Sequence, residues 1–103
     1  FTYQALLRAD ARTQEAAQAF LAAAREAART LSGAEHLTLY PPVPMQIQRI
    51  ANVERAQMLL ESSSRPALQH VLGHWHADLV RCKALPEAKG LIRWAMDVDP
   101  LAI

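Results

Sequence analysis

The stretch of residues 91–100, near the end of the sequence, alternates apolar and polar side chains. Its apolar positions are Ile92, Trp94, Met96 and Val98. A period of two is the signature of a β-strand with one buried face. Pro100 has no N–H to donate to a neighbouring strand, so we expect pairing to stop there. This stretch therefore predicts a closing strand in a sheet that is covered on one side.

Three earlier segments also have the pattern of strands, namely residues 3–9, 36–40 and 53–61. In each, the alternation decides which side chains share a face of the sheet. Residues 41–44, between the second and third strands, include three prolines. Proline can neither continue a helix nor fill a central strand. We therefore expect residues 41–44 to form a stiff connection.

Two segments predict amphipathic helices. The first begins after Thr13, a favourable N-cap, and runs to about Leu31, with Gly33 suited to a left-handed cap at its end. The second begins after the N-cap Ser64, and Pro66 is tolerated in its first turn. The apolar stripe of this second helix consists of Leu68, Val71, Leu72, Trp75, Leu79 and Cys82.

The predicted order of elements is β-α-β-β-α-β, which is the order of the ferredoxin-like fold. It predicts an α+β domain in which two helices cover one face of a four-stranded sheet. The 103 residues suit one domain with one core, spanning residues 1–103. Because the first residue is Phe1 and not Met, we expect this domain to be a piece of a longer protein.

Charge and cysteine content limit the partners and the compartment. The net charge is +1 and the isoelectric point is about 8.2, whereas nucleic-acid-binding domains usually exceed about 9. Any DNA contact must therefore come from a local patch. The single Cys82 can form no internal disulfide, so we expect a small buried side chain in a reducing compartment. We see no secretory leader and no apolar run long enough for a membrane span.

The face of the sheet that the helices leave uncovered, called the open face below, is the first candidate site. Strand parity gives it Arg8, Thr38, Tyr40, Arg55, Gln57 and Arg93. Arginines beside a tyrosine on a sheet can hold phosphates and stack a base. The candidate DNA-binding residues are therefore Arg8, Tyr40, Arg55 and Arg93. The alternative is an ordinary solvated face on which Arg8 or Arg93 pairs with Asp97.

The start of the second helix is another candidate site. Arg65 lies in its first turn and Gln69 four residues further on, so both side chains project from the same side of the helix. Free N–H groups and the positive end of the helix dipole favour an anion there, and the arginine fork suits a carboxylate. An acidic peptide or a phosphate would fit. The alternative is ordinary polarity next to a capped helix.

The sequence carries no enzyme or metal motif that would point to catalysis. Three glycines are too few for the phosphate-binding and dinucleotide-binding loops, and no nucleophile elbow is present. His70, His74 and His76 look like a metal cluster, but His70 and His74, with Asp78 next along their face, lie opposite the apolar stripe of the helix, so we interpret that face as a solvent-facing stripe. We expect no catalytic residue, no metal and no cofactor in this chain.

Five segments, in this order, carry a family pattern. They are ALLRA (residues 5–9), PVPM (42–45), RAQMLLES (55–62), RPALQ (65–69) and RWAMDVDP (93–100). Together they resemble the C-terminal domain of the PriA family, the primosomal replication-restart DNA helicases also described as primosomal protein N′. The resemblance spans essentially the whole chain.

The resemblance implies a ferredoxin-like module, similar to a small-subunit ribosomal protein, in an ATP-dependent 3′→5′ DNA helicase of replication restart and primosome assembly. It implies a cytoplasmic domain at bacterial replication forks that helps bind DNA and packs against the helicase core. ATP, magnesium and zinc would belong to upstream parts of the parent protein. Arg65 and Gln69 match the family's contacts to the acidic C-terminal tail of single-strand DNA-binding protein.

Two positions depart from the family pattern, and one other function fits the predicted fold. Where relatives often carry a glycine and an aromatic residue ahead of the third strand, this chain has Asn52 and Glu54. Glu54 removes a stacking ring and repels phosphate. The alternative function is a ligand-sensing regulatory module, for example one that binds amino acids, on a ferredoxin-like fold. Against it, no glycine-rich turn follows the first strand to receive a ligand.

Overall fold

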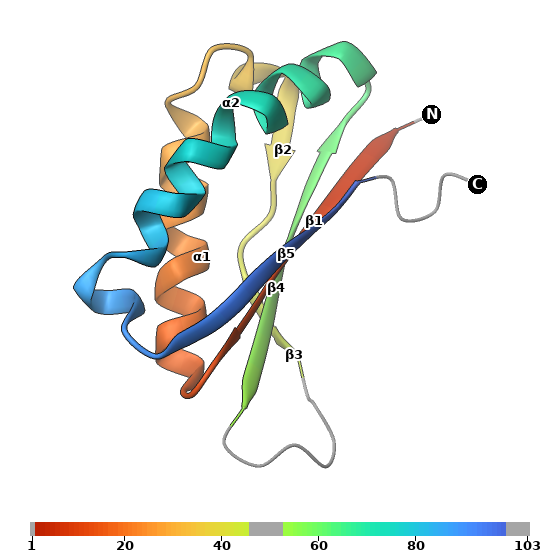
Figure 1. The fold of residues 1–103 in the computed structure, drawn as a ribbon. Helices are drawn as coiled ribbons and strands as arrows, with labels where there is room; N and C mark the ends of the chain where they lie inside the picture. Colours follow the sequence, from red (N-terminus) through yellow and green to blue (C-terminus); the bar gives the residue numbers. More distant parts are fainter. Residues whose placement is uncertain (1, 46–52, 99–103) are drawn as a thin grey trace.

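The computed structural model describes residues 2–45 and 53–98. They form an α+β fold of two helices and an antiparallel sheet. The elements are β1 (Tyr3–Ala11), α1 (Gln14–Arg29), β2 (Leu37–Leu39), β3 (Val43–Met45), β4 (Glu54–Ser62), α2 (Arg65–Lys83) and β5 (Leu91–Val98), with short 3₁₀ turns at Ala34–His36 and Pro86–Ala88. Both helices lie on the same side of the sheet (Figure 1).

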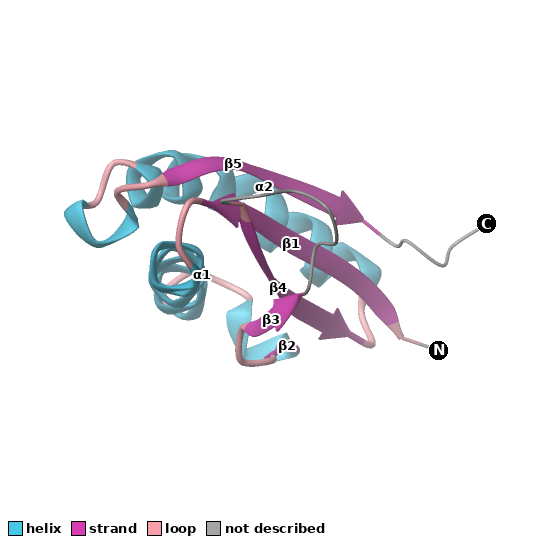
Figure 2. Cartoon of the chain, turned by 90° about the horizontal axis from the view of Figure 1, so that it is seen from below, coloured by secondary structure: helices cyan, strands magenta, loops and turns pink. Residues whose placement is uncertain are grey.

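The first strand of the chain lies in the middle of the sheet. The strand order is β2-β4-β1-β5, and β3 also pairs with β4. All pairings are antiparallel, and Ala9 of β1 lies opposite Ala56 of β4 and Trp94 of β5. Figure 2 shows β1 between these two strands. Segments from the two ends of the described chain thus meet in the sheet.

The predicted second strand is present as β2, but a further strand, β3, begins in the predicted connection, so the sheet of the described residues has five strands and not four. β2 pairs with residues 60–62 of β4, and β3 pairs with residues 55–57 of the same strand. The segment 41–44 is therefore not only a connection, because Val43 and Pro44 belong to β3. An edge strand accepts Pro44 because a missing N–H there need not be paired.

The core lies between the helices and the inner face of the sheet. Its largest side chains are Trp75, Phe20, Leu7, Leu21, Met58, Leu60, Leu68, Leu79 and Val71. The indole Nε1 of Trp75 donates a hydrogen bond to the carbonyl oxygen of Ala24 at 2.9 Å, which joins α2 to α1. Cys82 is buried, as predicted, and burial raises the pKa of its thiol.

The two helix starts agree with the sequence, and one helix end does not. The side chains of Thr13 and Ser64 each accept a hydrogen bond from the backbone N–H three residues on, at 3.1 and 3.3 Å. The predicted cap at Gly33 is wrong, because α1 ends at Arg29 and Thr30 caps it in a right-handed conformation. Gly33 has a φ of 93° and instead precedes the 3₁₀ turn. Neither helix is long and apolar enough to cross a membrane, within the described residues.

The closing strand is less covered than its alternation predicts. Trp94 and Met96 pack half-buried against the core, whereas Ile92 and Val98 are 43% and 47% exposed. β5 is an edge strand, and its register with β1 shifts at Ile92, which takes that residue out of the alternation. Pro100, predicted to end the pairing, lies outside the described residues.

Candidate nucleic-acid and partner interface

The strand register brings three charged residues side by side on the open face. Asp10 of β1 lies directly opposite Arg55 of β4 and directly opposite Arg93 of β5. Residues opposite each other in antiparallel strands have Cβ atoms about 5 Å apart on the same face. Two arginines from different strands therefore flank one carboxylate.

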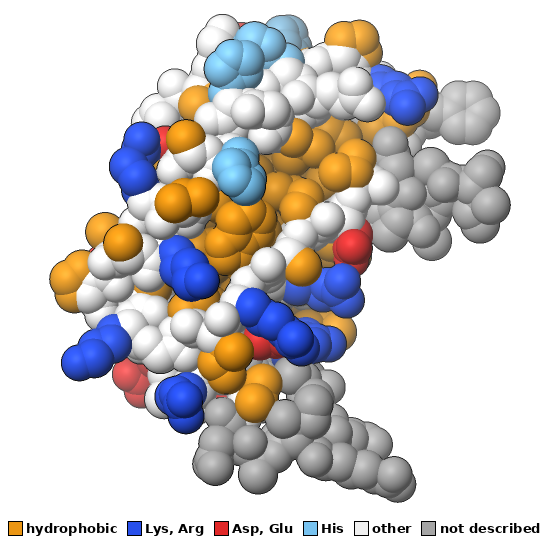
Figure 3. All heavy atoms as spheres, in the orientation of Figure 1, with side chains coloured by type: hydrophobic (Ala, Val, Ile, Leu, Met, Phe, Trp, Pro, Cys, Tyr) orange, Lys and Arg blue, Asp and Glu red, His pale blue; other side chains and the backbone are white. Residues whose placement is uncertain are grey.

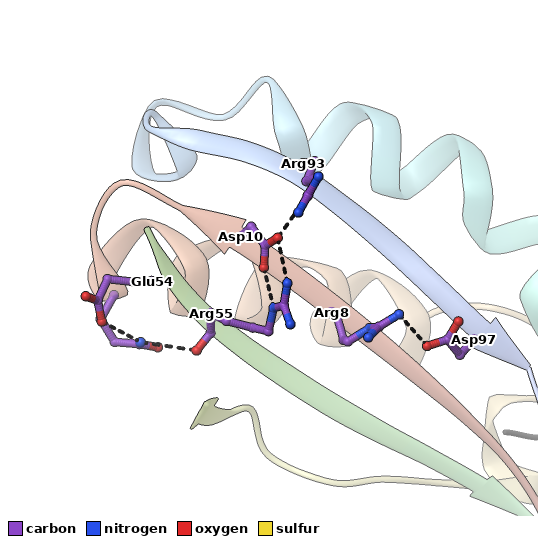
Figure 4. Close-up of polar contacts among 7 residues, drawn as sticks. Arg8, Asp10, Glu54, Arg55, Arg93 and Asp97 are labelled. Atoms are coloured by element: carbon purple, nitrogen blue, oxygen red, sulfur yellow. Dashed lines mark hydrogen bonds and ion pairs between the residues drawn. The ribbon is translucent and has the colours of Figure 1, made fainter. Parts of the chain in front are cut away.

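Both arginines bind the Asp10 carboxylate (Figure 4). Arg55 donates through Nε to Oδ1 at 2.7 Å and through Nη2 to Oδ2 at 3.1 Å, and Arg93 donates through Nε to Oδ2 at 2.9 Å. The Asp10 side chain is 6% exposed, whereas that of Arg93 is 70% exposed. The hydrogen bond from Arg55 is the main reason that the pKa of the Asp10 carboxyl lies below its usual range, and it outweighs the opposing effect of burial. The same bond raises the pKa of Arg55.

Arg8 lies on the same face and has a different acidic partner. Its Nη2 is 2.6 Å from Oδ2 of Asp97, and both side chains are partly exposed. Its Nε is buried and has no hydrogen-bond partner among the residues that the structure describes. Of the two pairings considered from the sequence, the one between Arg8 and Asp97 is confirmed. Arg93 pairs with Asp10 instead, because the register sets these two directly opposite each other.

Tyr40 follows β2 and reaches an acid on β4. Its backbone N–H donates to the carbonyl oxygen of Leu59 at 3.0 Å, and its hydroxyl donates to Oε1 of Glu61 at 3.0 Å. Gln4 donates to the other oxygen of Glu61, also at 3.0 Å. The bond to Glu61 raises the pKa of Tyr40, and the bonds from Gln4 and Tyr40 lower the pKa of Glu61. The polar end of the tyrosine therefore lies next to a negative charge.

A shallow depression of about 260 Å³ lies among these charges. Its lining residues are Arg8, Asp10, Arg55, Arg93, Trp94 and Ala95. The three guanidiniums face two carboxylates, those of Asp10 and Asp97, so one positive charge is in excess. The volume is below the range of about 300–1,000 Å³ that is usual for drug-sized ligands. The depression is suited to a small anion such as a phosphate group.

The four predicted DNA-binding residues thus share one face of the sheet. Arg8, Arg55 and Arg93 line the same depression, and Tyr40 lies on that face opposite the strand position of Leu59. Their contact with DNA stays a prediction. The sequence alone did not predict that Asp10 pairs with Arg55 and Arg93, although the alternation in β1 places Asp10 on the open face. The signal that could have indicated this pairing is an acidic residue two positions after Arg8, on the same face of the strand.

The second candidate pair lies in the helix layer, at the start of α2. Arg65 is the first residue of the helix, and both Arg65 and Gln69 are exposed. Ser64 caps this helix start by accepting a hydrogen bond from the backbone N–H of Ala67 at 3.3 Å. Binding of a partner at this pair stays a prediction.

Glu54, one of the two departures from the family pattern, is exposed at the start of β4. Its Oε1 accepts a hydrogen bond from Nε2 of Gln14 at 3.4 Å, and the same nitrogen donates to the carbonyl oxygen of Arg55 at 3.3 Å. This contact keeps a negative charge next to the backbone of Arg55. Asn52, the other departure, lies outside the described residues.

His70 and His74 of α2 are exposed, as predicted for a solvent-facing stripe, and His76 is exposed too, but Asp78 is not part of that stripe. The rings of His70 and His74 are 4.4 Å apart, and that of His76 lies 5.6 Å from Trp94. Asp78 is 8% exposed and pairs with Arg81. Its position is three residues after a buried tryptophan on the helix, which turns it inward. Across residues 2–45 and 53–98, no three potential metal ligands gather in one place.

The lowered pKa of Asp10 predicts a specific acid sensitivity. A carboxyl whose pKa is lower in the folded than in the unfolded state stabilises the fold above the unfolded pKa, about 3.9, and this stability is lost as the pH falls through the folded pKa. Between pH 5 and pH 2, the free energy of unfolding of the original chain should therefore fall more steeply than that of Asp10→Asn. Urea unfolding followed by circular dichroism measures both slopes. Parallel slopes would contradict the expectation.

Comparison with known protein families places this chain in one of them. Residues 1–101 match the family model described as the primosomal protein N C-terminal domain, PriA_C. This family is a non-catalytic C-terminal domain of a helicase and points to a role in the primosome and in replication restart, with DNA or replication proteins as partners. Because the match covers nearly the whole sequence, the chain belongs to the family of primosomal protein N (PriA) C-terminal domains.

Proposed function

We propose that this chain is the DNA- and partner-binding C-terminal domain of an ATP-dependent 3′→5′ DNA helicase of replication restart and primosome assembly. One observation carries the proposal: Arg8, Arg55 and Arg93 line one shallow depression on an uncovered sheet face, where their guanidiniums can bind phosphate. Family membership supports the same role. The domain binds partners in the bacterial cytoplasm, at replication forks, and the ATP-driven chemistry belongs to the rest of the parent protein.

We infer that the fold is a variant of the ferredoxin-like fold. If β2 and β3 count as one edge strand interrupted at Pro41 and Pro42, the order of elements becomes β-α-β-β-α-β. This arrangement, similar to a small-subunit ribosomal protein, leaves one face of the sheet free for nucleic acid.

DNA binds the open face mainly through its backbone phosphates. Arg93 has the most exposed of the three guanidiniums, and a guanidinium retains further N–H donors when one is already used. The ring of Tyr40 offers a surface on which a base can stack. Because Asp10, Asp97 and Glu61 lie beside these groups, the affinity of this face alone is moderate.

The acidic C-terminal tail of single-strand DNA-binding protein binds at the start of α2. Arg65 presents a planar fork that suits a carboxylate, and Gln69 adds amide donors one turn further on. The positive end of the α2 dipole also favours a negatively charged carboxylate at this helix start. Both side chains are exposed, so an extended peptide can reach them.

The helicase core of the same parent protein packs on the hollow between α2 and β5. Figure 3 displays apolar side chains gathered in this hollow. Leu72 of α2 and Trp94 and Met96 of β5 are only partly buried, and Val98 is about half exposed. A contiguous apolar surface on a small domain favours a protein partner.

Replacing Arg8 and Arg93 together by glutamine is expected to weaken binding of single-stranded DNA about ten-fold at low salt. The loss follows from two fewer cations for the phosphates, and each lost contact lowers the slope of log affinity against log salt by about 0.7. Fluorescence anisotropy with a labelled oligonucleotide over a series of salt concentrations measures both quantities.

A matched control is Arg29→Gln with Arg81→Gln. It removes two exposed arginines that also pair with acids, but from the helix layer. We expect this control to keep most of the affinity. Equal losses in the two double variants, or no loss in the first, would overturn the assignment of the open face. Chemical-shift changes with free amino acids in place of DNA would favour the ligand-sensing alternative.

A further inference from the structure

The Asp10 carboxylate is nearly enclosed while its two guanidinium partners reach solvent. The side chain of Asp10 is 6% exposed, that of Arg55 is 28% exposed and that of Arg93 is 70% exposed. Three hydrogen bonds of 2.7 to 3.1 Å converge on its two oxygens. The arrangement is a pair of arginines already holding an anion, and that anion belongs to the chain itself.

A carboxylate and a phosphate compete for the same guanidinium geometry. The arginine fork binds either group through two parallel N–H···O bonds. Arg55 gives its Nε and one Nη2 proton to Asp10, and Arg93 gives its Nε. A phosphate that approaches the depression therefore meets arginines whose best-aligned donors are engaged and whose charge is partly neutralised.

The three arginines also need a counter-charge to share this face. Arg55 and Arg93 flank the same residue of β1, Asp10, and Arg8 lies two residues before it on that strand. Like charges this close repel each other on an uncovered sheet face. Asp10 lies between Arg55 and Arg93 and reduces this repulsion, and its hydrogen bonds hold both side chains in place.

We propose that Asp10 is an internal counter-anion that lowers the affinity of the open face for nucleic-acid phosphate. It makes binding at this face depend on the exposed donors of Arg93 and on sharing or displacing the internal carboxylate. The inference rests on the proposed function, in which the open face binds DNA, and adds the residue that limits that binding.

The test is the variant Asp10→Asn, which keeps the shape of the side chain and removes its charge. We expect it to bind a labelled single-stranded oligonucleotide about five-fold more tightly than the original chain at low salt, since one repulsive charge is gone. The magnitude of the slope of log affinity against log salt should also rise. A purely structural role for Asp10 would lower stability and leave the affinity unchanged or reduced.

The matched control is Asp78→Asn. Asp78 is also a buried aspartate paired with an arginine, but it lies on α2, in the helix layer. Its replacement gives the same change in net charge, and we expect an affinity close to that of the original chain. Equal tightening in both variants would assign the effect to net charge and overturn the proposal.

The outcomes separate the inference from the function on which it rests. Suppose that the double variant Arg8→Gln with Arg93→Gln weakens DNA binding and Asp10→Asn does not strengthen it. The open face then binds DNA, but Asp10 does not compete with DNA phosphate for the arginines. If the double arginine variant has no effect, the proposed function itself fails.

A measurement on the original chain covers the case in which Asp10→Asn does not fold. The Nε–H signals of Arg55 and Arg93 in an NMR titration with the oligonucleotide report directly on their bonds to Asp10. We expect both signals to shift on binding. If DNA binds and both signals stay in place, the proposal is wrong.

Discussion

Replacing Trp75 by alanine should cost about 3–5 kcal/mol of the free energy of unfolding. Trp75 is the largest of the fully buried side chains, and its Nε1 donates to the carbonyl oxygen of Ala24 at 2.9 Å. The variant loses both the packing of the indole and the hydrogen bond that joins the two helices. Small domains are stable by only about 5–15 kcal/mol, so a large share of the total would be lost. Urea unfolding followed by circular dichroism measures the change.

Trp94→Ala is the comparison for this variant. Trp94 is half-buried on the edge strand, with its ring 6.3 Å from that of Phe20 and 5.6 Å from that of His76. We expect less than half of the destabilisation caused by Trp75→Ala, since partial burial gives a smaller cavity and less lost transfer energy. Equal losses would mean that the core extends under β5 further than the burial of its side chains indicates.

The second prediction with a large expected effect concerns the contribution of Arg65 to peptide binding. In the parent protein, Arg65→Ala is expected to weaken binding of the acidic tail peptide of single-strand DNA-binding protein about ten-fold or more, since a charge-assisted hydrogen bond to a carboxylate is lost. Gln69→Ala should reduce the affinity less, because an amide donor carries no charge. Isothermal titration calorimetry with the peptide measures the affinities.

Arg81→Ala is the control on the same helix. Arg81 is an exposed arginine in the last turn of α2, at the end opposite Arg65, and its removal changes the net charge by the same amount. We expect nearly unchanged peptide binding. Tail binding by Arg65→Ala as tight as that of the original protein would show that the start of α2 is not the site.

Much of the fold could be predicted from local signals. The caps Thr13 and Ser64 mark where the helices begin, and the alternation in β1 and β4 gives the correct inner and outer faces. The additional strand β3 could not be predicted in the same way. A proline excludes a central strand, but whether the residues around Pro44 pair at an edge depends on a neighbouring strand that only the tertiary structure provides.

The candidate site, too, could be predicted only in part from the sequence. Strand parity was enough to assign Arg8, Arg55 and Arg93 to one face, because it depends on the sequence alone. The partners of these arginines depend on register, which sets Asp10 opposite both Arg55 and Arg93. A shift of one residue in either pairing would have given other partners. Local pattern therefore predicts the composition of a site, and the long-range pairing decides which charges in it remain available.

The central position of β1 has a consequence for how the chain folds during synthesis. Both neighbours of β1 are made later than β1 itself, and one of them, β5, is the last strand of the described chain. Contacts that are distant in sequence form slowly because a long loop must close first. Until the ribosome has made β5, one side of β1 has no native partner and its backbone groups remain open to other strands. We therefore expect nascent chains that stop before Leu91 to aggregate or to need a chaperone, because β1 gains its second native neighbour only once β5 has left the ribosome.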